Sequence, residues 1–175
     1  VSVGWEKPKE TFEINVGGLA NFLDWQNKVT SLRTTLVITS DKVYKLDGAH
    51  TPRIEDSALG GDDPYSASKA AAELLTLTWP MSNTKVIGTA RSGNVIGGGD
   101  VCSDRLIPDL VDSYISGTTP KLRAPNAIRP WQHVLDCLNG YLLLVENTIR
   151  TQENGVWNFG PDESKSKTVL EVANL

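Results

Sequence analysis

Residues 36–42 read Leu-Val-Ile-Thr-Ser-Asp-Lys, and residues 63–69 read Asp-Pro-Tyr-Ser-Ala-Ser-Lys. The first stretch predicts a short buried strand, because three apolar residues run together and polar residues follow them. The second predicts the start of a helix, since an Asp followed by a Pro is typical of an N-cap and a first helical position. A strand followed by a helix indicates a fold in which the two alternate.

The alternation continues on both sides of these two stretches. Apolar residues from Phe12 to Leu23 recur at helical spacing, which predicts a helix from Pro8 to about Asn27. The remaining expected elements are a loop over 44–63, a helix over 65–79, a strand over 86–90, helices near 104–116 and 134–150, and an extended segment over 156–159. The order predicts a doubly wound parallel α/β sheet of the Rossmann type, with its site at the carboxyl ends of the strands.

Composition and charge exclude several classes of protein. The net charge of −4 gives no basic surface for nucleic acid or an anionic membrane. The longest apolar cluster, Tyr141-Leu-Leu-Leu-Val145, is far shorter than the roughly 20 residues that span a bilayer, and we expect it in the core. Cys102 and Cys137 have no metal-ligand spacing, so we predict no metal site and a reducing, cytoplasmic location.

Tyr65 and Lys69 are four residues apart and therefore share one face of the predicted helix. A tyrosine has an ordinary pKa of about 10, and a neighbouring cation lowers it by favouring the phenolate. The pair is a candidate base that removes a hydroxyl proton while a hydride leaves the same carbon. A surface pair on an ordinary helix is the competing interpretation of these two residues alone.

Two further residues give this pair a context. Ser40 closes the strand at 36–38, and Asn15 lies on the preceding helix. The order Asn15, Ser40, Tyr65, Lys69 resembles the Asn-Ser-Tyr-Lys tetrad of short-chain dehydrogenases. Taken by itself, Asn15 would be interpreted as an amide on a helix surface.

The pair Asp41-Lys42, directly after Ser40, narrows the resemblance. Nucleotide-sugar dehydratases carry a charged pair there that performs the elimination: Asp-Glu in dTDP-glucose enzymes and Asp-Lys in CDP-glucose enzymes. Epimerases of the same superfamily have uncharged residues at this place. A solvated turn is the competing interpretation.

Longer segments are similar to the CDP-glucose 4,6-dehydratase family in order and spacing, and with the motifs above they cover nearly the whole chain. They are Arg91-Ser-Gly-Asn-Val-Ile-Gly-Gly-Gly-Asp100, Asp104-Arg-Leu-Ile-Pro-Asp109, Ile128-Arg-Pro-Trp-Gln-His-Val134 and Trp157-Asn-Phe-Gly-Pro161. The resemblance implies that Asn94, Arg105 and Arg129 bind the nucleotide diphosphate, and a guanidinium suits phosphate oxygens. His133 is expected to be structural.

The resemblance implies conversion of CDP-D-glucose to CDP-4-keto-6-deoxy-D-glucose, with NAD taking a hydride from C4 and returning it to C6, in deoxysugar or surface polysaccharide biosynthesis. Tyr65 would be the base and Ser40 would orient the 4-oxygen. Lys42 would assist loss of the C5 proton, and Asp41 would protonate the departing C6 hydroxyl. Asn15, Tyr65 and Lys69 would hold the cofactor. Homodimers or homotetramers would form through the helices at 8–27 and 65–79.

The dinucleotide fingerprint Gly-x-x-Gly-x-x-Gly of the family does not occur in this sequence, and Gly97-Gly-Gly99 follows a late strand with the wrong spacing. We therefore expect residues 1–175 to form a single partial domain, incomplete at both ends. Residues 1–100 would be the rear half of the NAD-binding domain, and residues 101–175 mostly a small substrate lobe. Another sugar-nucleotide dehydratase, an epimerase, an inactive nucleotide-sugar-binding fragment and a structural partner remain as alternatives.

Overall fold

A computed structural model describes residues 1–48, 51–82, 85–102 and 104–175 and divides the chain into two compact units. Unit 1 comprises Val1–Ser92 and Gly140–Phe159, and unit 2 comprises Gly93–Asn139 and Gly160–Leu175. The assignment of residues 1–100 to a cofactor domain and of 101–175 to a substrate lobe remains a prediction.

Unit 1 contains a three-stranded parallel sheet in the order β1-β2-β6. Its strands are β1 (Thr34–Ile38), β2 (Val86–Ser92) and β6 (Gly155–Phe159). Ile38 pairs with Ala90, and Ser92 pairs with Phe159, so the carboxyl ends of the strands share one edge of the sheet. The strands predicted at 36–38, 86–90 and 156–159 are thereby confirmed, each with a slightly longer extent. The arrangement is the predicted α/β, Rossmann-like fold.

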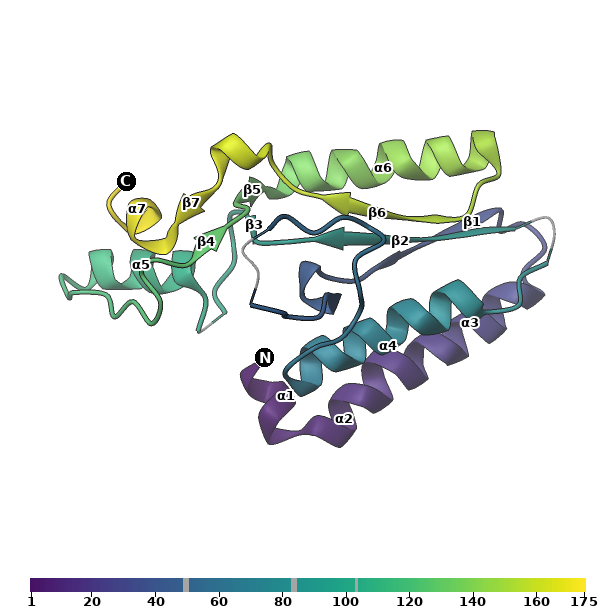
Figure 1. The fold of residues 1–175 in the computed structure, drawn as a ribbon, viewed down its shortest axis with the longest axis horizontal. Coiled ribbons are helices and arrows are strands. Elements are labelled where there is room, and N and C mark those ends of the chain that lie inside the picture. The colour runs from purple at the N-terminus through teal and green to yellow at the C-terminus, as the bar shows by residue number, and fades with distance from the viewer. Residues whose placement is uncertain (49–50, 83–84, 103) are drawn as a thin grey trace. The chain divides into compact units, whose positions relative to one another are not determined.

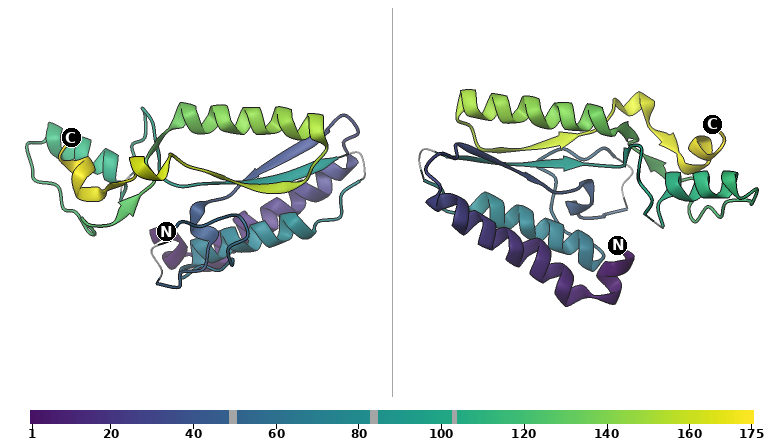
Figure 2. Two further views of the ribbon diagram at one scale, coloured as in Figure 1. Left: turned by 45° about the horizontal axis from the view of Figure 1, so that its top comes forward. Right: turned by 180° about the vertical axis from the view of Figure 1, so that it is seen from behind.

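Helices cover both faces of this sheet (Figure 1, Figure 2). On one face lie the predicted helix at 8–27, observed as α2 (Pro8–Phe12), the π-helix η1 (Glu13–Gly18) and α3 (Leu19–Lys28), and beside it α4 (Pro64–Thr78). On the other face lies α6 (Val134–Thr151), which belongs to unit 1 from Gly140 onward. Two short helices, α1 (Ser2–Glu6) and the 3-10 helix η2 (Asp41–Val43), complete unit 1.

Glycines allow large aromatic rings to pack between the sheet and α6. A Cβ on Gly140 would lie 2.7 Å from Cε1 of Phe159, and a Cβ on Gly88 would lie 2.6 Å from Cζ3 of Trp157. Tyr141 meets Phe159 edge-to-face with ring centroids 4.9 Å apart, and its hydroxyl donates a hydrogen bond of 2.9 Å to Ser92 Oγ. These contacts fix α6 against the carboxyl half of β6.

One prediction about the core is wrong in part. Of the leucines at 142–144, only Leu144 is buried, while Leu142 and Leu143 are 66% and 56% exposed. Successive residues of a helix point about 100° apart, so one face of α6 cannot bury all three. In the helix at 8–27, Leu23 is fully buried, but Phe12 is 38% exposed.

Unit 2 is built from short elements. In it, β3 (Val95–Ile96) pairs in parallel with β5 (Gln132–His133), and β4 (Ile128–Arg129) pairs antiparallel with β7 (Lys167–Thr168). Its helices are α5 (Leu106–Ile115), which confirms the prediction near 104–116, the 3-10 helix η3 (Glu163–Lys165) and α7 (Val169–Ala173). Among the described residues of the whole chain, no helix combines the length and the apolar character needed to cross a membrane.

The loop predicted over 44–63 lies between η2 and α4 in unit 1. Tyr44 and Leu59 form an isolated antiparallel bridge, and the N–H of Gly60 donates a hydrogen bond of 2.8 Å to the carbonyl of Val43. Residues 49 and 50 of this loop lie outside the described residues. The bridge holds the two ends of the loop together next to the start of α4.

Candidate active site

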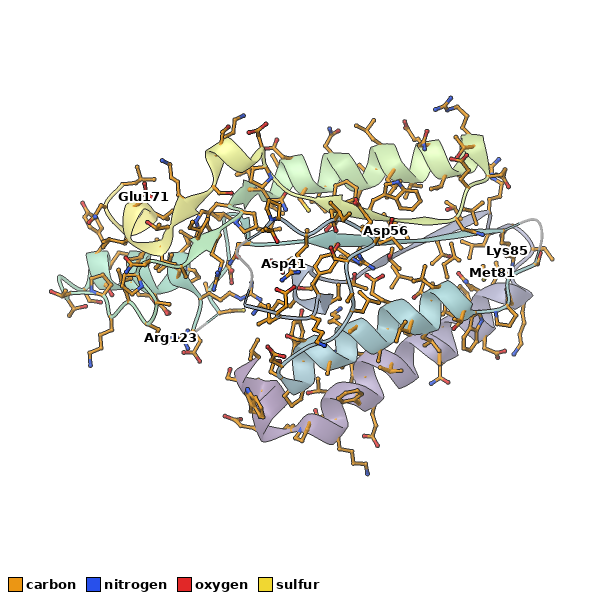
Figure 3. The ribbon with its side chains drawn as sticks, in the orientation of Figure 1. Asp41, Asp56, Met81, Lys85, Arg123 and Glu171 are labelled. Carbon is orange, nitrogen blue, oxygen red and sulfur yellow. The ribbon has the colours of Figure 1, made fainter. Side chains whose placement is uncertain are left out.

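The end of β1 presents the first group of predicted site residues. The N–H of Thr39 donates a hydrogen bond of 2.9 Å to the carbonyl of Ala90, which extends the sheet ladder by one residue. Ser40 caps η2: its Oγ accepts from the N–H of Lys42 at 3.2 Å and donates to Asp41 Oδ1 at 3.1 Å. The hydroxyl and the carboxylate therefore meet at the carboxyl end of β1, and Figure 3 shows Asp41 toward that end of the sheet.

The start of α4 is fixed by its cap. Asp63 accepts hydrogen bonds from the backbone N–H groups of Tyr65 and Ser66, at 2.9 and 3.0 Å, and Pro64 occupies the first turn, as predicted. Burial opposes ionisation of Asp63, but the hydrogen bonds from Ser66 and Tyr65 and the charge of Lys42 outweigh burial and lower its pKa. Asp63 is therefore a charged N-cap that places Tyr65 in the first turn.

Close backbone packing surrounds this turn. A Cβ on Gly61 would lie 2.4 Å from the backbone nitrogen of Ala67, and Gly61 has a φ of +142°, which favours glycine. A Cβ on the buried Gly4 would lie 3.1 Å from the nitrogen of Tyr65. Since only glycine fits without displacement, α1 and the loop before α4 both lie directly against the segment that carries Tyr65.

Lys69 joins α4 to the end of β1. Its Nζ donates a hydrogen bond of 3.3 Å to the carbonyl of Ile38, two residues before Ser40. Burial lowers the pKa of Lys69, and the negative charge of Glu73 opposes that shift. The ammonium of Lys69 thus lies at the strand end that carries the predicted catalytic residues.

Asn15 lies in the π-helix η1, a helix type that is rare and often occurs at functional sites. Its Nδ2 donates a hydrogen bond of 2.9 Å to Ser68 Oγ, and that hydroxyl donates one of 2.8 Å to the carbonyl of Tyr65. The amide is therefore attached to the turn of α4 that separates Tyr65 from Lys69.

Hydrogen bonds in unit 1 thus join the segments that carry five of the predicted residues: Asn15, Ser40, Asp41, Tyr65 and Lys69. Lys42 is exposed, and its charge acts on Asp63. A phenol, an ammonium, a hydroxyl and a carboxylate at the carboxyl edge of a parallel sheet suit proton transfer to and from a sugar. The ammonium and phenol are also suitable donors to the ribose hydroxyls of a dinucleotide.

Asn94, Arg105 and Arg129 all lie in unit 2. The carbonyl of Asn94 accepts a hydrogen bond of 3.1 Å from the N–H of Gln132, which brings two of the quoted motifs together. Arg105 donates to Asp100 Oδ2 at 3.2 Å, and Arg129 donates to the carbonyl of Ile128 at 2.8 Å. Binding of a diphosphate by these three residues stays a prediction.

His133 belongs to unit 2, whereas the surface pockets belong to unit 1. In unit 2, Nδ1 of His133 accepts a hydrogen bond of 3.2 Å from the N–H of Leu135 in the first turn of α6. Two pockets of about 200 and 350 Å³ lie at the amino ends of β2 and β6 in unit 1, and both are lined by Met81 and Asn154. Figure 3 shows Met81 and Lys85 at this opposite end of the sheet. No candidate site residue lines either pocket.

Sequence reasoning assigned no role to three buried residues next to the site: Thr39, Glu73 and Arg91. Glu73 is four residues after Lys69 and so lies on the same face of α4. The sequence feature that could have identified Glu73 is its position on the helix face that carries the predicted catalytic Lys69. The partner of Glu73, Arg91, is on another element, and helical spacing alone could not identify it.

Comparisons with known proteins identify the family of this chain. The sequence profile of the NAD dependent epimerase/dehydratase family matches residues 1–160. A CDP-glucose 4,6-dehydratase from Salmonella typhimurium is 37% identical over 97% of this chain and 50% of its own length. A dTDP-glucose 4,6-dehydratase from Streptomyces griseus is 30% identical, over 89% of this chain and 46% of its own length.

Solved structures show the same fold. A double mutant of the dTDP-glucose 4,6-dehydratase DesIV from Streptomyces venezuelae, with NAD and DAU bound, has a TM-score of 0.81. It is 21% identical, and the match covers 99% of this chain and 52% of that chain. RMD from Pseudomonas aeruginosa, complexed with NADPH, has a TM-score of 0.82 at 25% identity, over 99% of this chain and 60% of that one.

This chain spans about half the length of the curated relatives it matches. The predicted resemblance to nucleotide-sugar dehydratases of the extended short-chain dehydrogenase type is confirmed, and so is the predicted cofactor, because the matching family is NAD dependent. With residues 1–160 matched and the tetrad segments in contact, the chain belongs to the NAD dependent epimerase/dehydratase family.

Proposed function

We propose that this chain carries the catalytic residues of a nucleotide-sugar 4,6-dehydratase that converts CDP-D-glucose to CDP-4-keto-6-deoxy-D-glucose. The observation that carries the proposal is the position of Asp41 and Lys42. They follow Ser40 directly, at the strand end that Lys69 contacts through the carbonyl of Ile38. The 37% identical CDP-glucose 4,6-dehydratase supports the choice of nucleotide.

In the first step, Tyr65 accepts the proton of the sugar 4-hydroxyl, and Ser40 donates a hydrogen bond to the 4-oxygen. Lys69 favours the phenolate of Tyr65 by its charge. Asn15, Tyr65 and Lys69 would hold NAD, which would supply the hydride chemistry at C4 and C6. The half-buried position of Lys69 strengthens its electrostatic effect, because water screens it less than it screens a surface lysine.

In the elimination, Lys42 assists removal of the C5 proton, which the 4-ketone has acidified, and it assists return of a proton to C5 when C6 is reduced. Asp41 donates a proton to the departing C6 hydroxyl, which leaves as water. Ser40 Oγ donates to Asp41 Oδ1 at 3.1 Å, so the carboxyl group is oriented toward the strand end before substrate binds. Asn94, Arg105 and Arg129 bind the nucleotide diphosphate. A role in deoxysugar or surface polysaccharide biosynthesis and a cytoplasmic location remain predictions.

The test is turnover by the complete protein with NAD and each of CDP-, UDP- and dTDP-glucose. The expected product has lost one water, and the expected order places CDP-glucose first in kcat/KM. An isomer of unchanged mass would indicate an epimerase, and no product with any of the three would indicate a nucleotide-sugar-binding protein. Either result would contradict the proposal.

Asp41→Asn sharpens this test, because a carboxamide cannot donate the acid proton. Oxidation at C4 then remains possible while water loss is blocked, so NADH absorbance should rise and persist. The matched control is Asp112→Asn on the exposed surface of α5, which should behave as the parent protein. Formation of the 6-deoxy-4-keto product at the parent rate by the Asp41 variant would remove Asp41 from the elimination.

We further propose that the protein forms a homodimer or homotetramer through the helices at 8–27 and 65–79. These helices expose six large apolar side chains in unit 1: Phe12, Ile14, Phe22, Trp25, Leu74 and Leu77. Phe22 and Trp25 are in contact, with ring centroids 5.5 Å apart. Exposed apolar side chains gathered on neighbouring helices are typical of protein interfaces.

A further inference from the structure

A buried ion pair joins α4 to β2 next to the residues of the proposed active site. Glu73, on α4, has a side chain that is 0% exposed, and its partner Arg91, on β2, is 2% exposed. Arg91 Nε donates to Glu73 Oε1, and Arg91 Nη2 donates to Oε2, both at 3.0 Å. Two parallel hydrogen bonds of this kind fix orientation as well as distance.

Two threonines complete the surroundings of the Glu73 carboxylate. Thr89 Oγ1, in the middle of β2, donates to Oε2 at 2.8 Å. Thr39 Oγ1, directly beyond β1, donates to Oε1. The carboxylate therefore joins α4 to two neighbouring strands, and one of the two connections is the residue that immediately precedes Ser40.

Arg91 extends the connection toward β6. Its Nη1 donates to the hydroxyl of Tyr44 at 2.9 Å and to the carbonyl of Glu55 at 3.0 Å. The Tyr44 hydroxyl in turn donates to Asn158 Oδ1 at 2.6 Å. Tyr44 follows η2, which contains Asp41 and Lys42, so this segment is also held by the pair.

A buried ion pair is a poor source of net stability, because removing two charges from water costs about as much as their attraction returns. Its fixed geometry is therefore the property to explain. The pair is linked to both segments that carry proposed catalytic residues. Lys69 is four residues before Glu73 on α4, and Ser40 follows Thr39, whose hydroxyl donates to Glu73. The charge of Glu73 also opposes the lowering of the Lys69 pKa by burial.

We propose that Glu73 and Arg91 are positioning residues of the proposed active site: they fix α4, with Tyr65 and Lys69, against the strand end that carries Ser40 and Asp41. The inference rests on the proposed function. Neither side chain touches the sugar in this role, and both act through the alignment of other residues. Misplacement of reacting groups by about 1 Å can cost on the order of 100-fold in rate.

The test compares two matched substitutions, Thr39→Val and Thr89→Val. Each replaces one hydroxyl that donates to the same buried carboxylate, so similar losses in Tm are expected. Only Thr39 adjoins Ser40. In the complete protein with CDP-glucose, Thr39→Val should lower kcat about 10- to 100-fold with KM nearly unchanged, while Thr89→Val should lower kcat less than about 3-fold. Thr39→Ser, which keeps the hydroxyl, should restore kcat.

A second measurement needs no turnover. Competitive acetylation with acetic anhydride, followed by mass spectrometry, reports access to the Lys69 ammonium, with the 88% exposed Lys9 as internal reference. Labelling of Lys69 should increase several-fold in Thr39→Val and stay at the parent level in Thr89→Val. The more severe variants Glu73→Gln and Arg91→Lys should increase it further wherever they fold.

The outcomes separate this proposal from the proposed function. Equal effects of Thr39→Val and Thr89→Val on kcat and on Lys69 labelling, or no effect of either, would show that the pair serves stability alone and would overturn the positioning role. If the parent protein converts none of the three nucleotide sugars, the proposed function fails. Lys69 labelling then decides the positioning proposal by itself.

Discussion

Tyr65 is held by its backbone as well as by its side chain. Its N–H donates to the Asp63 carboxylate at 2.9 Å, and Gly4 packs against its Cβ. Tyr65→Phe keeps this packing and removes only the hydroxyl, so we expect kcat to fall by about 10²–10⁴, the usual cost of losing a general base. The control is Tyr114→Phe, since Tyr114 is 89% exposed on α5. A loss of only a few-fold in the Tyr65 variant would exclude this base.

The lowered pKa of Lys69 predicts how kcat/KM depends on pH. Burial lowers its pKa, against the opposing charge of Glu73, so the neutral amine forms at a lower pH than for a free lysine. If the ammonium is required, kcat/KM should decline on the alkaline side below about pH 10.4, the ordinary lysine value. Lys69→Arg retains its charge at high pH, so its profile should lose this decline even if its maximum is lower. The same alkaline decline in both proteins would contradict the assignment.

At the residue scale, the sequence and the structure agree where chemistry depends on local spacing. Tyr65, Lys69 and the Asp63 cap share one short segment, so helix geometry predicts their arrangement. Glu73 and Arg91 are different, because their contact depends on how α4 packs on β2. Nothing in helical spacing determines the packing partner of a buried glutamate.

At the scale of the element, α4 depends on its cap. Asp63→Ala should lower the free energy of unfolding by about 1 kcal/mol, because two backbone N–H groups lose their acceptor. Asp63→Asn should cost less, since an amide oxygen still accepts both hydrogen bonds. Thermal or urea unfolding of the chain measures both. Equal losses in the two variants would assign the stabilisation to charge rather than to capping.

The lowered pKa of the Asp63 carboxylate also predicts that the stability of the protein falls in acid. Hydrogen bonds from Ser66 and Tyr65 and the charge of Lys42 outweigh burial and lower the pKa of Asp63 in the folded state. The stabilisation is therefore complete above the unfolded value of about 3.9 and is lost as pH falls toward the lower folded value. The free energies of unfolding of the parent and Asp63→Asn proteins should converge as the pH falls from 6 to 3. A constant difference between the two proteins across that range would contradict a stabilising role for the Asp63 charge.

Most helices and strands follow from the sequence because their signals are local. Pro64 at the first position of α4 and the apolar run before Ser40 are enough to place both elements. The π-helix at Glu13–Gly18 could not be predicted, since its apolar spacing also fits an α-helix. Its widened turn depends on tertiary packing, and Asn15 within it contacts Ser68 on a different helix.

At the scale of the whole molecule, alternating strands and helices predict a parallel sheet but not how the chain is partitioned. Residues 140–159 return to unit 1, although they follow unit 2 residues in sequence. Pairing of β6 with β2 produces this return, and strand pairing between distant residues leaves no local pattern. Leu142 and Leu143 likewise look like core residues in sequence and are exposed on α6.

Self-association is the prediction that belongs to this scale. The apolar side chains of the helices at 8–27 and 65–79 include Trp25 and Leu77, which are 54% and 51% exposed. Burying them against a second copy would remove apolar surface from water, and a stable interface needs about 1,000 Å² or more. Light scattering after size exclusion should show a dimer or tetramer for the complete protein. Trp25→Glu should shift it to the monomer, because a carboxylate at the centre of such an interface would be buried without a partner.

Leu142→Glu is the matched control, since Leu142 is 66% exposed but lies on α6, which covers the opposite face of the sheet (Figure 1). It introduces the same charge at an apolar position that is also more than half exposed, and it should leave the oligomer intact. Dissociation by Leu142→Glu, with Trp25→Glu unchanged, would move the interface to α6. A monomer at every concentration of the parent protein would show that the apolar side chains of 8–27 and 65–79 do not mediate self-association.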